Sequence, residues 1–308
     1  MKYSRTVTFV FITILLFVNT AFSESYLSET GKSGMSFLNI TPSARIASLG
    51  GGASAYMTGA SSLWSNPSLI ALQSERTAQF THTKWIEGIN QEYAAVSTRI
   101  NYGTIGLGAQ LFDSGDIDGR DDYGGSTGTY SITNAALSIS YASMVNNWIA
   151  LGVTYKKLFQ KVSDETAGGY AFDGGFTVIT PIKGLSFAAV GRNYGEMGKL
   201  KSVRTKLPSN ISFGCLYSDV APGIDRSYSV LADVILPRYG DTGIRLGVEV
   251  DAGDYLVLRI GYRNDSDFED MIFGVGFDWD IISADISYSP LNNISDDAMR
   301  FTLSITGF

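Results

Sequence analysis

Residues 243–263 read GIRLGVEVDAGDYLVLRIGYR, two runs in which apolar and polar side chains alternate on either side of a short turn. Alternation with a period of two is typical of β-strands that have one apolar and one polar face. The segments 270–278, 281–289 and 298–307 repeat the pattern. Such faces predict either a soluble sandwich, whose charged face meets water, or a membrane barrel, whose charged face lines the lumen.

Fourteen short strands of this kind are expected between Arg76 and the last residue. Their predicted bounds are Arg76–Trp85, Gln91–Ile100, Gly103–Phe112, Tyr130–Tyr141, Asn147–Phe159, Gly169–Thr180, Leu185–Tyr194, Pro208–Ser218, Arg226–Leu236, Gly243–Asp251, Asp254–Arg263, Asp270–Asp278, Ile281–Ser289 and Ala298–Gly307. The connections alternate between roughly nine and roughly four residues, as in outer-membrane barrels, which have long outer loops and short periplasmic turns. The sequence therefore predicts an all-β fold, a 14-stranded antiparallel transmembrane β-barrel.

The alternation of loop lengths also predicts an orientation, with both ends of the mature chain in the periplasm. The loops expected outside lie near Trp85, Asp116, Lys161, Lys199, Tyr239, Asp267 and Asn293. The charges expected to face the lumen are Arg99, Lys156, Arg245, Glu249, Arg259, Arg263, Asp278, Asp285 and Arg300. The aromatic residues expected to form interfacial girdles are Trp85, Tyr102, Phe112, Tyr141, Trp148, Phe159, Tyr194, Trp279 and Tyr288.

The first 23 residues are expected to be a secretory signal peptide. Lys2 and Arg5 precede an apolar run from residue 7 to 18, and a small-x-small cleavage site ends near Ser23. The run, about twelve residues, is shorter than the roughly twenty that span a bilayer. Loss of Lys2 and Arg5 changes the formal charge from −7 to −9, which argues against nucleic acid as a partner. Export and a barrel together predict residence in a Gram-negative-type outer membrane, with its lipid and the barrel-assembly machinery as partners.

The chain then divides into residues 24–74, expected to form an N-terminal hatch or plug, and residues 75–308, expected to form the barrel. The first of these segments is rich in small residues and has neither clean alternation nor a long helical face. It includes a Gly50-Gly51-Gly52 cluster and an Asn66-Pro67-Ser68 turn. A segment of about forty residues ahead of a barrel is long enough to fold into the lumen. A free periplasmic tail is the alternative.

The stretches PSARIASLGGGASAY (42–56) and ASSLWSNPSLIAL (60–72) resemble the N-terminal signature of the PorV/PorQ family, itself similar to the FadL long-chain fatty-acid transporters. Later segments, among them WIALGVTYKKLFQKV and KLPSNISFGCLY, resemble that family in the same order. The resemblance implies a fourteen-stranded barrel whose hatch includes an Asn-Pro-Ala element. Asn66-Pro67-Ser68 stands at that place here, with Ser68 as a departure.

No residue pattern predicts an enzyme, a catalytic residue or a cofactor. His82 is the only histidine and lies near no Gly-x-Ser-x-Gly motif, so it reads as an ordinary strand residue. Cys215 falls on an apolar strand face and is expected to be a small filler. The weak candidates for a metal, a calcium ion on an outer loop, are Asp113, Asp116, Asp118, Asp121 and Asp122; a solvated acidic loop is the alternative.

Three glycines of the third predicted strand, Gly103, Gly106 and Gly108, are suited to a bend. In FadL-like proteins such a kink opens the wall sideways, so the resemblance implies an opening there.

Two functions remain open from the sequence. The resemblance to PorV/PorQ implies a non-enzymatic barrel that binds or shuttles secreted proteins to a translocon in type IX-like secretion. The likeness to FadL implies transport of long-chain fatty acids or other hydrophobic small molecules. The charged lumen expected from the last five strands favours the first function over the second.

Overall fold

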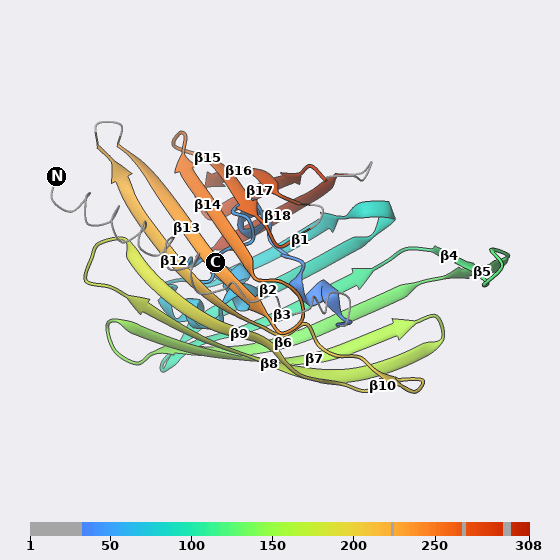
Figure 1. Cartoon of the computed structure of the whole chain (residues 1–308). Helices are drawn as coiled ribbons and strands as arrows, with labels where there is room; N and C mark the ends of the chain where they lie inside the picture. Colours follow the sequence, from blue (N-terminus) through green and yellow to red (C-terminus); the bar gives the residue numbers. More distant parts are fainter. Residues whose placement is uncertain (1–32, 223–224, 267–268, 292–296) are drawn as a thin grey trace.

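The computed structural model describes residues 33–222, 225–266, 269–291 and 297–308, so the predicted signal peptide lies outside the described residues. Fourteen antiparallel strands close into a barrel around a short N-terminal segment (Figure 1). The barrel strands are β1 (Thr77–Lys84), β2 (Asn90–Ile100), β3 (Gly103–Asp113), β6 (Ile132–Met144), β7 (Ile149–Val162), β8 (Glu165–Ile179), β9 (Leu185–Met197), β12 (Asn210–Ala221), β13 (Arg226–Pro237), β14 (Gly243–Asp251), β15 (Leu256–Arg263), β16 (Met271–Trp279), β17 (Ile282–Ser289) and β18 (Ala298–Thr306). The predicted fold and strand count are therefore confirmed. Within the described ranges, no helix is long and apolar enough to cross a membrane.

The apolar side chains of the strands point outward. On β16, Phe273, Val275 and Phe277 are 44–49% exposed, whereas Ile272 and the glycines between them are buried. An outward apolar face of this kind repeats on every strand from β14 to β18. A surface so rich in exposed large apolar residues suits contact with lipid rather than water.

The connections at one end of the barrel are longer than those at the other, as the sequence predicts. Two small hairpins extend the longer end: β4 (Ile117–Arg120) with β5 (Ser126–Tyr130), and β10 (Lys199–Leu200) with β11 (Val203–Arg204). The first hairpin projects well beyond the barrel (Figure 1). The loop predicted near Lys161 is wrong, because β7 and β8 pair up to a two-residue turn at Ser163, which has a left-handed φ of 54°. The predicted loop sites at Asp267 and Asn293 lie outside the described residues.

The N-terminal segment fills the lumen as five short helices. These are η1 (Ser36–Asn39), α2 (Ala44–Ala47), η2 (Gly59–Ser61), α3 (Ser62–Ser65) and η3 (Pro67–Leu72). We call residues 33–74 the plug. Its apolar residues form two cores against the inner wall, one around Trp64 and Ile70 and one around Phe37 and Leu38. The plug is buried along most of its length, and it is not a free tail.

Two expectations about the wall are wrong. Strand β3 pairs in continuous register with β2 and β6, so Gly103, Gly106 and Gly108 open no gap; the side chain of Leu63 instead fills the space above Gly106. Trp85 and Phe112 do not join a girdle, because Trp85 covers the Arg300 guanidinium at 4.8 Å and Phe112 packs on Phe37 of the plug. The remaining predicted girdle residues are exposed.

Candidate functional site

The Asn66-Pro67-Ser68 turn seats the plug against β7 and β8. The Asn66 amide oxygen accepts hydrogen bonds from the Ser68 backbone (3.0 Å) and hydroxyl (2.8 Å), which closes the turn. Its amide nitrogen donates to the Ser54 carbonyl at 2.7 Å and to Thr177 of β8 at 3.2 Å. All these groups are buried, and the Ser68 hydroxyl also lies 2.7 Å from the Thr177 hydroxyl, so the polar groups of the turn are satisfied within the lumen.

Paired glycines of the wall make room for this turn. Gly152 of β7 lies opposite Gly175 of β8. A Cβ on Gly175 would lie 1.9 Å from Asn66 Oδ1, and one on Gly152 would lie 2.4 Å from the Pro67–Ser68 peptide. We call Gly152 and Gly175 the first glycine seat. Only a residue without a side chain lets the two backbones approach this closely.

A second glycine seat lies on β14 and β15. Gly247 and Gly261 are also cross-strand partners. Their missing side chains leave space for Leu49 and for Gly50, whose φ of +72° needs glycine; a Cβ on Gly261 would lie 2.0 Å from the Gly50 nitrogen. The plug is thus held against two separate parts of the wall.

One ion-pair network joins the plug to the wall through Arg45. Its guanidinium donates to both carboxylate oxygens of Glu249 on β14, at 3.1 and 2.8 Å. Arg259 on β15 bridges Glu249 and Asp285 on β17, at 2.5 and 2.6 Å. Tyr56 of the plug donates to Glu249 and accepts from Arg45 at 2.7 Å. Burial raises the pKa of Tyr56 to about 12, against the opposing effect of Arg45, so its phenol stays neutral near pH 7.

A second network lies at the end of the lumen nearer the long loops. Asp265, in the connection between β15 and β16, binds Arg245 at 2.6 Å and Arg263 at 2.8 Å. Glu269 in the same connection binds Arg263 and Arg300, at 3.3 and 3.2 Å. Burial acts to raise the pKa of Asp265, but the two guanidinium groups outweigh it and hold that pKa below its usual range. Arg245 also donates to the Gly51 carbonyl at 3.0 Å, which ties this network to the plug.

A third cluster braces an irregular point in the wall. Lys156 of β7 lies 2.7 Å from Asp173 of β8 and donates to the Asn193 side chain at 2.8 Å. Asp173 accepts from the Asn193 backbone nitrogen at 2.8 Å. Asn193 has a left-handed φ of 61°, and the register of β8 against β9 shifts here, between Phe172 and Gly174. These buried polar contacts hold β9 in the kinked conformation.

The predicted lumenal charges divide by position. Six are buried inside the barrel: Lys156, Arg245, Glu249, Arg259, Asp285 and Arg300. Arg263 and Asp278 are half-buried. Arg99 was expected to line the lumen, but it is exposed near the end of β2 and does not join the enclosed networks.

Sequence reasoning missed six further charges of the lumen. Asp173, Arg192, Asp233 and Glu269 are buried, and Arg45 and Asp265 are half-buried. Asp173 shares one face of β8 with Ala171 and Gly175, so the alternation along this strand could have placed it in the lumen. Arg45 lies in the plug and Asp265 in a loop. Neither segment has the strand alternation that assigns a side chain to the lumen.

The remaining candidates lie near the long-loop end of the barrel. Asp121 accepts hydrogen bonds from the backbone of Tyr123 and Gly125 in its own loop, and Asp113 accepts from Gly115. In the described part of the chain, no three His, Cys, Asp or Glu side chains gather in a way that suits a metal. His82 contacts Glu92 at 2.6 Å on the outward face of β1 and β2.

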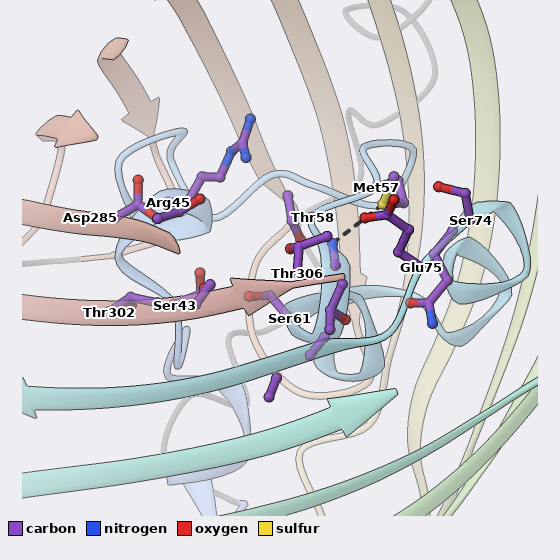
Figure 2. Close-up of a pocket in the computed structure, with 17 residues that line it drawn as sticks. Ser43, Arg45, Met57, Thr58, Ser61, Ser74, Glu75, Asp285, Thr302 and Thr306 are labelled. Carbon is purple, nitrogen blue, oxygen red and sulfur yellow. Dashed lines mark hydrogen bonds between the residues drawn. The ribbon is translucent and has the colours of Figure 1, made fainter. Parts of the chain in front are cut away.

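A pocket of about 210 Å³ lies between the plug and the wall, at the end where β1 begins and β18 ends. Figure 2 shows it lined by plug residues such as Ser43 and Ser61 and by Thr302 and Thr306 of β18. Arg45 and Asp285 reach its rim, so the pocket joins the first ion-pair network. Ser and Thr hydroxyl groups dominate the lining of this pocket, which suits water and polar groups more than a long apolar chain.

No family model and no curated protein matches the sequence. The fold is similar to the toluene transporter TodX of Pseudomonas putida, with 12% identity and a TM-score of 0.57 over 85% of this chain and 95% of that one. A deltaS2 mutant of TodX, described as a monoaromatic hydrocarbon channel, gives 11% identity and a TM-score of 0.59 over 86% and 98%. A FadL homologue of Pseudomonas aeruginosa gives 12% identity and a TM-score of 0.51 over 83% and 95%.

Identities this low establish the fold alone, and none of the comparisons singles out the PorV/PorQ branch. The plugged fourteen-stranded barrel is thus similar in fold to the TodX transporter and to this FadL homologue.

Proposed function

We propose that this protein is a non-enzymatic outer-membrane transport barrel of the FadL type, which passes hydrophobic small molecules across the membrane. One observation carries the proposal. A plug is seated across the lumen of a fourteen-stranded barrel that is similar, over most of its length, to structures named a toluene transporter and a hydrocarbon channel. The outward apolar face of the strands supports an outer-membrane location, with the long-loop end outside.

The plug is the element that must move in such a transporter. Buried ion pairs and the plug occupy the lumen, so an apolar solute meets charged groups such as Arg45 and Glu249 along the barrel axis. Desolvating those groups without their partners costs several kcal/mol. Transport therefore depends on a state in which the plug has left at least one glycine seat and its part of the wall is free.

Uptake by the purified protein tests the proposal. Proteoliposomes that contain the full mature chain are expected to take up toluene and a long-chain fatty acid faster than empty liposomes. A water-soluble sugar of similar size serves as the specificity control. Equal uptake with and without the protein, for both hydrophobic probes, would overturn the transport function.

Binding of secreted proteins, as in type IX-like secretion, is a second candidate. Its support is the PorV/PorQ-like sequence at residues 42–72 together with the exposed β4–β5 hairpin, which offers a contact surface outside the barrel. Affinity purification from outer membranes separates the two functions. Secreted proteins that co-purify with the barrel favour the second candidate, whereas bound lipid-like molecules without protein partners favour transport.

A further inference from the structure

The barrel closes through β9 and β12, but the pairing of these two strands stops before the C-terminal end of β9. Strand β9 pairs with β12 only from Leu185 to Arg192. Asn193 lies at the register shift, and the last four residues, Tyr194–Met197, pair with β8 but have no partner on β12. The chain then leaves the wall for the β10–β11 hairpin and returns along residues 205–209 to start β12. The kink at Asn193, held by Lys156 and Asp173, is what separates the two strands.

The unpaired edge begins at the level of an aromatic girdle. Tyr155, Phe172 and Tyr194 are outward-facing neighbours in register across β7, β8 and β9, and the rings of Tyr155 and Phe172 lie 5.4 Å apart. Rows of this kind mark the boundary between hydrocarbon and headgroups. Unpaired backbone groups are tolerated there because headgroups and water supply partners, whereas the hydrocarbon core does not. The edge therefore lies among lipid headgroups.

A basic cleft occupies this edge. Its volume is about 250 Å³, and its lining includes Tyr194, Glu196, Arg204, Lys206, Arg238 and Tyr239. Lys206 and Arg238 both lie against the Tyr239 ring, at 4.9 and 5.7 Å from its centre, so two cations flank one aromatic side chain of the cleft. Arg204 pairs with Glu196 at 3.4 Å, but both side chains are about 60% exposed, so this pair is weak.

The two cations beside Tyr239 are available to a ligand. Among the described residues, neither Lys206 nor Arg238 contacts a carboxylate. Lys199 and Lys201 in the adjacent hairpin add positive charge to the same end, in a chain whose overall charge is negative. Positive charge that is concentrated at a headgroup boundary complements an anionic lipid.

We propose that this cleft binds the phosphate groups of an outer-leaflet glycolipid. Lys206 and Arg238 would hold a phosphate above Tyr239, and the acyl chains would lie along the outward apolar face next to Tyr194. Arginine binds phosphate through a planar fork and lysine as a point charge, so the pair suits a tetrahedral anion. The inference rests on the proposed outer-membrane orientation, but it does not depend on which molecule the barrel transports.

Binding of a defined lipid to the full mature protein in detergent tests the proposal. The probes are lipid A with two phosphates, the same lipid without phosphates, and inorganic phosphate as a competitor. The variant K206Q/R238Q removes both cations that flank Tyr239. The control K84Q/R120Q removes the same charge from exposed residues at the same end of the barrel, away from the cleft. Heat-modifiable migration on gels checks that every variant is a folded barrel.

We expect the wild type and K84Q/R120Q to bind bisphosphorylated lipid A equally, and K206Q/R238Q to bind it about 30-fold more weakly. Lipid A without phosphates should bind the wild type as weakly as the phosphorylated lipid binds K206Q/R238Q. Equal binding of the two lipids would mean an apolar groove only and would overturn the proposal. Displacement of the lipid by millimolar inorganic phosphate, or an equal loss in both double variants, would also overturn it. A folded barrel that transports but fails this test refutes the lipid site alone.

Discussion

Replacement of Gly175 by alanine should loosen the plug without harming the barrel. The added Cβ would lie 1.9 Å from Asn66 Oδ1 and 3.2 Å from Pro67 Cδ, so the Asn66-Pro67-Ser68 turn must move away from the wall. Asn66 makes four hydrogen bonds at this seat, including one to Thr177 of β8. Because the backbone of Gly175 is not left-handed, alanine introduces no strain within β8 itself.

The expected magnitude follows from these contacts. An added methylene in a packed site costs about 1–3 kcal/mol. Each hydrogen bond that is lost costs a net ~0.5–1.5 kcal/mol. Displacement of the turn should therefore weaken plug docking by about 2–4 kcal/mol, which multiplies the ratio of open to closed barrels by roughly 30 to 1000.

Conductance of the purified protein in planar bilayers measures this ratio directly. We expect G175A to spend far more time in open states than the wild type, and cells that carry it to become more sensitive to large antibiotics. Gly174 provides the matched control, since a Cβ there meets nothing within 4 Å. Equal open probabilities for G175A and G174A, in barrels that both show heat-modifiable migration, would refute the role of the glycine seat.

Three further outcomes are expected. Asp265→Asn should destabilise the barrel by roughly 2–4 kcal/mol at pH 7 in urea unfolding, since the buried Arg245 and the half-buried Arg263 both lose this charged partner. The pKa of Asp265 is depressed in the folded state, so its contribution to the free energy of unfolding is complete above about pH 4 and falls as the pH drops further. Wild-type stability should therefore decline more steeply in acid than that of the variant. Parallel curves of stability against pH would contradict the role of the Asp265 carboxylate. Asp173→Asn should lower the temperature at which the folded band is lost in heat-modifiable migration, because Lys156 is left buried without a counter-ion. The double change with Lys156→Met should recover part of that loss. An additive loss in the double variant would argue against the ion pair. Deletion of residues 117–130 should leave barrel stability unchanged because the two strands of the hairpin pair with each other and project beyond the wall, and a loss of co-purifying proteins in that variant would locate a partner surface there.

The strands could be predicted from sequence because their signal is local. In residues 243–263 each side chain alternates between the two faces, and a period of two reports a strand without knowledge of its neighbours. The predicted bounds of β14 match the structure at both ends, and those of most other strands differ by a few residues. The turn at Ser163 was mistaken for a loop because polar residues at its flanks hide the extended pairing of β7 with β8.

The site could be predicted only in part. Glu249 and Arg259 were expected in the lumen because they alternate with apolar neighbours, but their partner Arg45 comes from a plug with no periodicity. Trp85 and Phe112 were assigned to a girdle from their place at strand ends, and contacts with Arg300 and Phe37 turn them inward instead.

By itself the sequence determined that this chain is a run of fourteen two-faced strands preceded by a small-residue segment with an Asn66-Pro67-Ser68 turn. Only the tertiary structure decided which face lines the lumen, where the plug sits and where the wall parts beside β9. The physical reason is that alternation is a property of neighbouring residues. The glycine seats, the ion-pair networks and the unpaired edge at Asn193 arise instead from contacts between residues far apart in the chain.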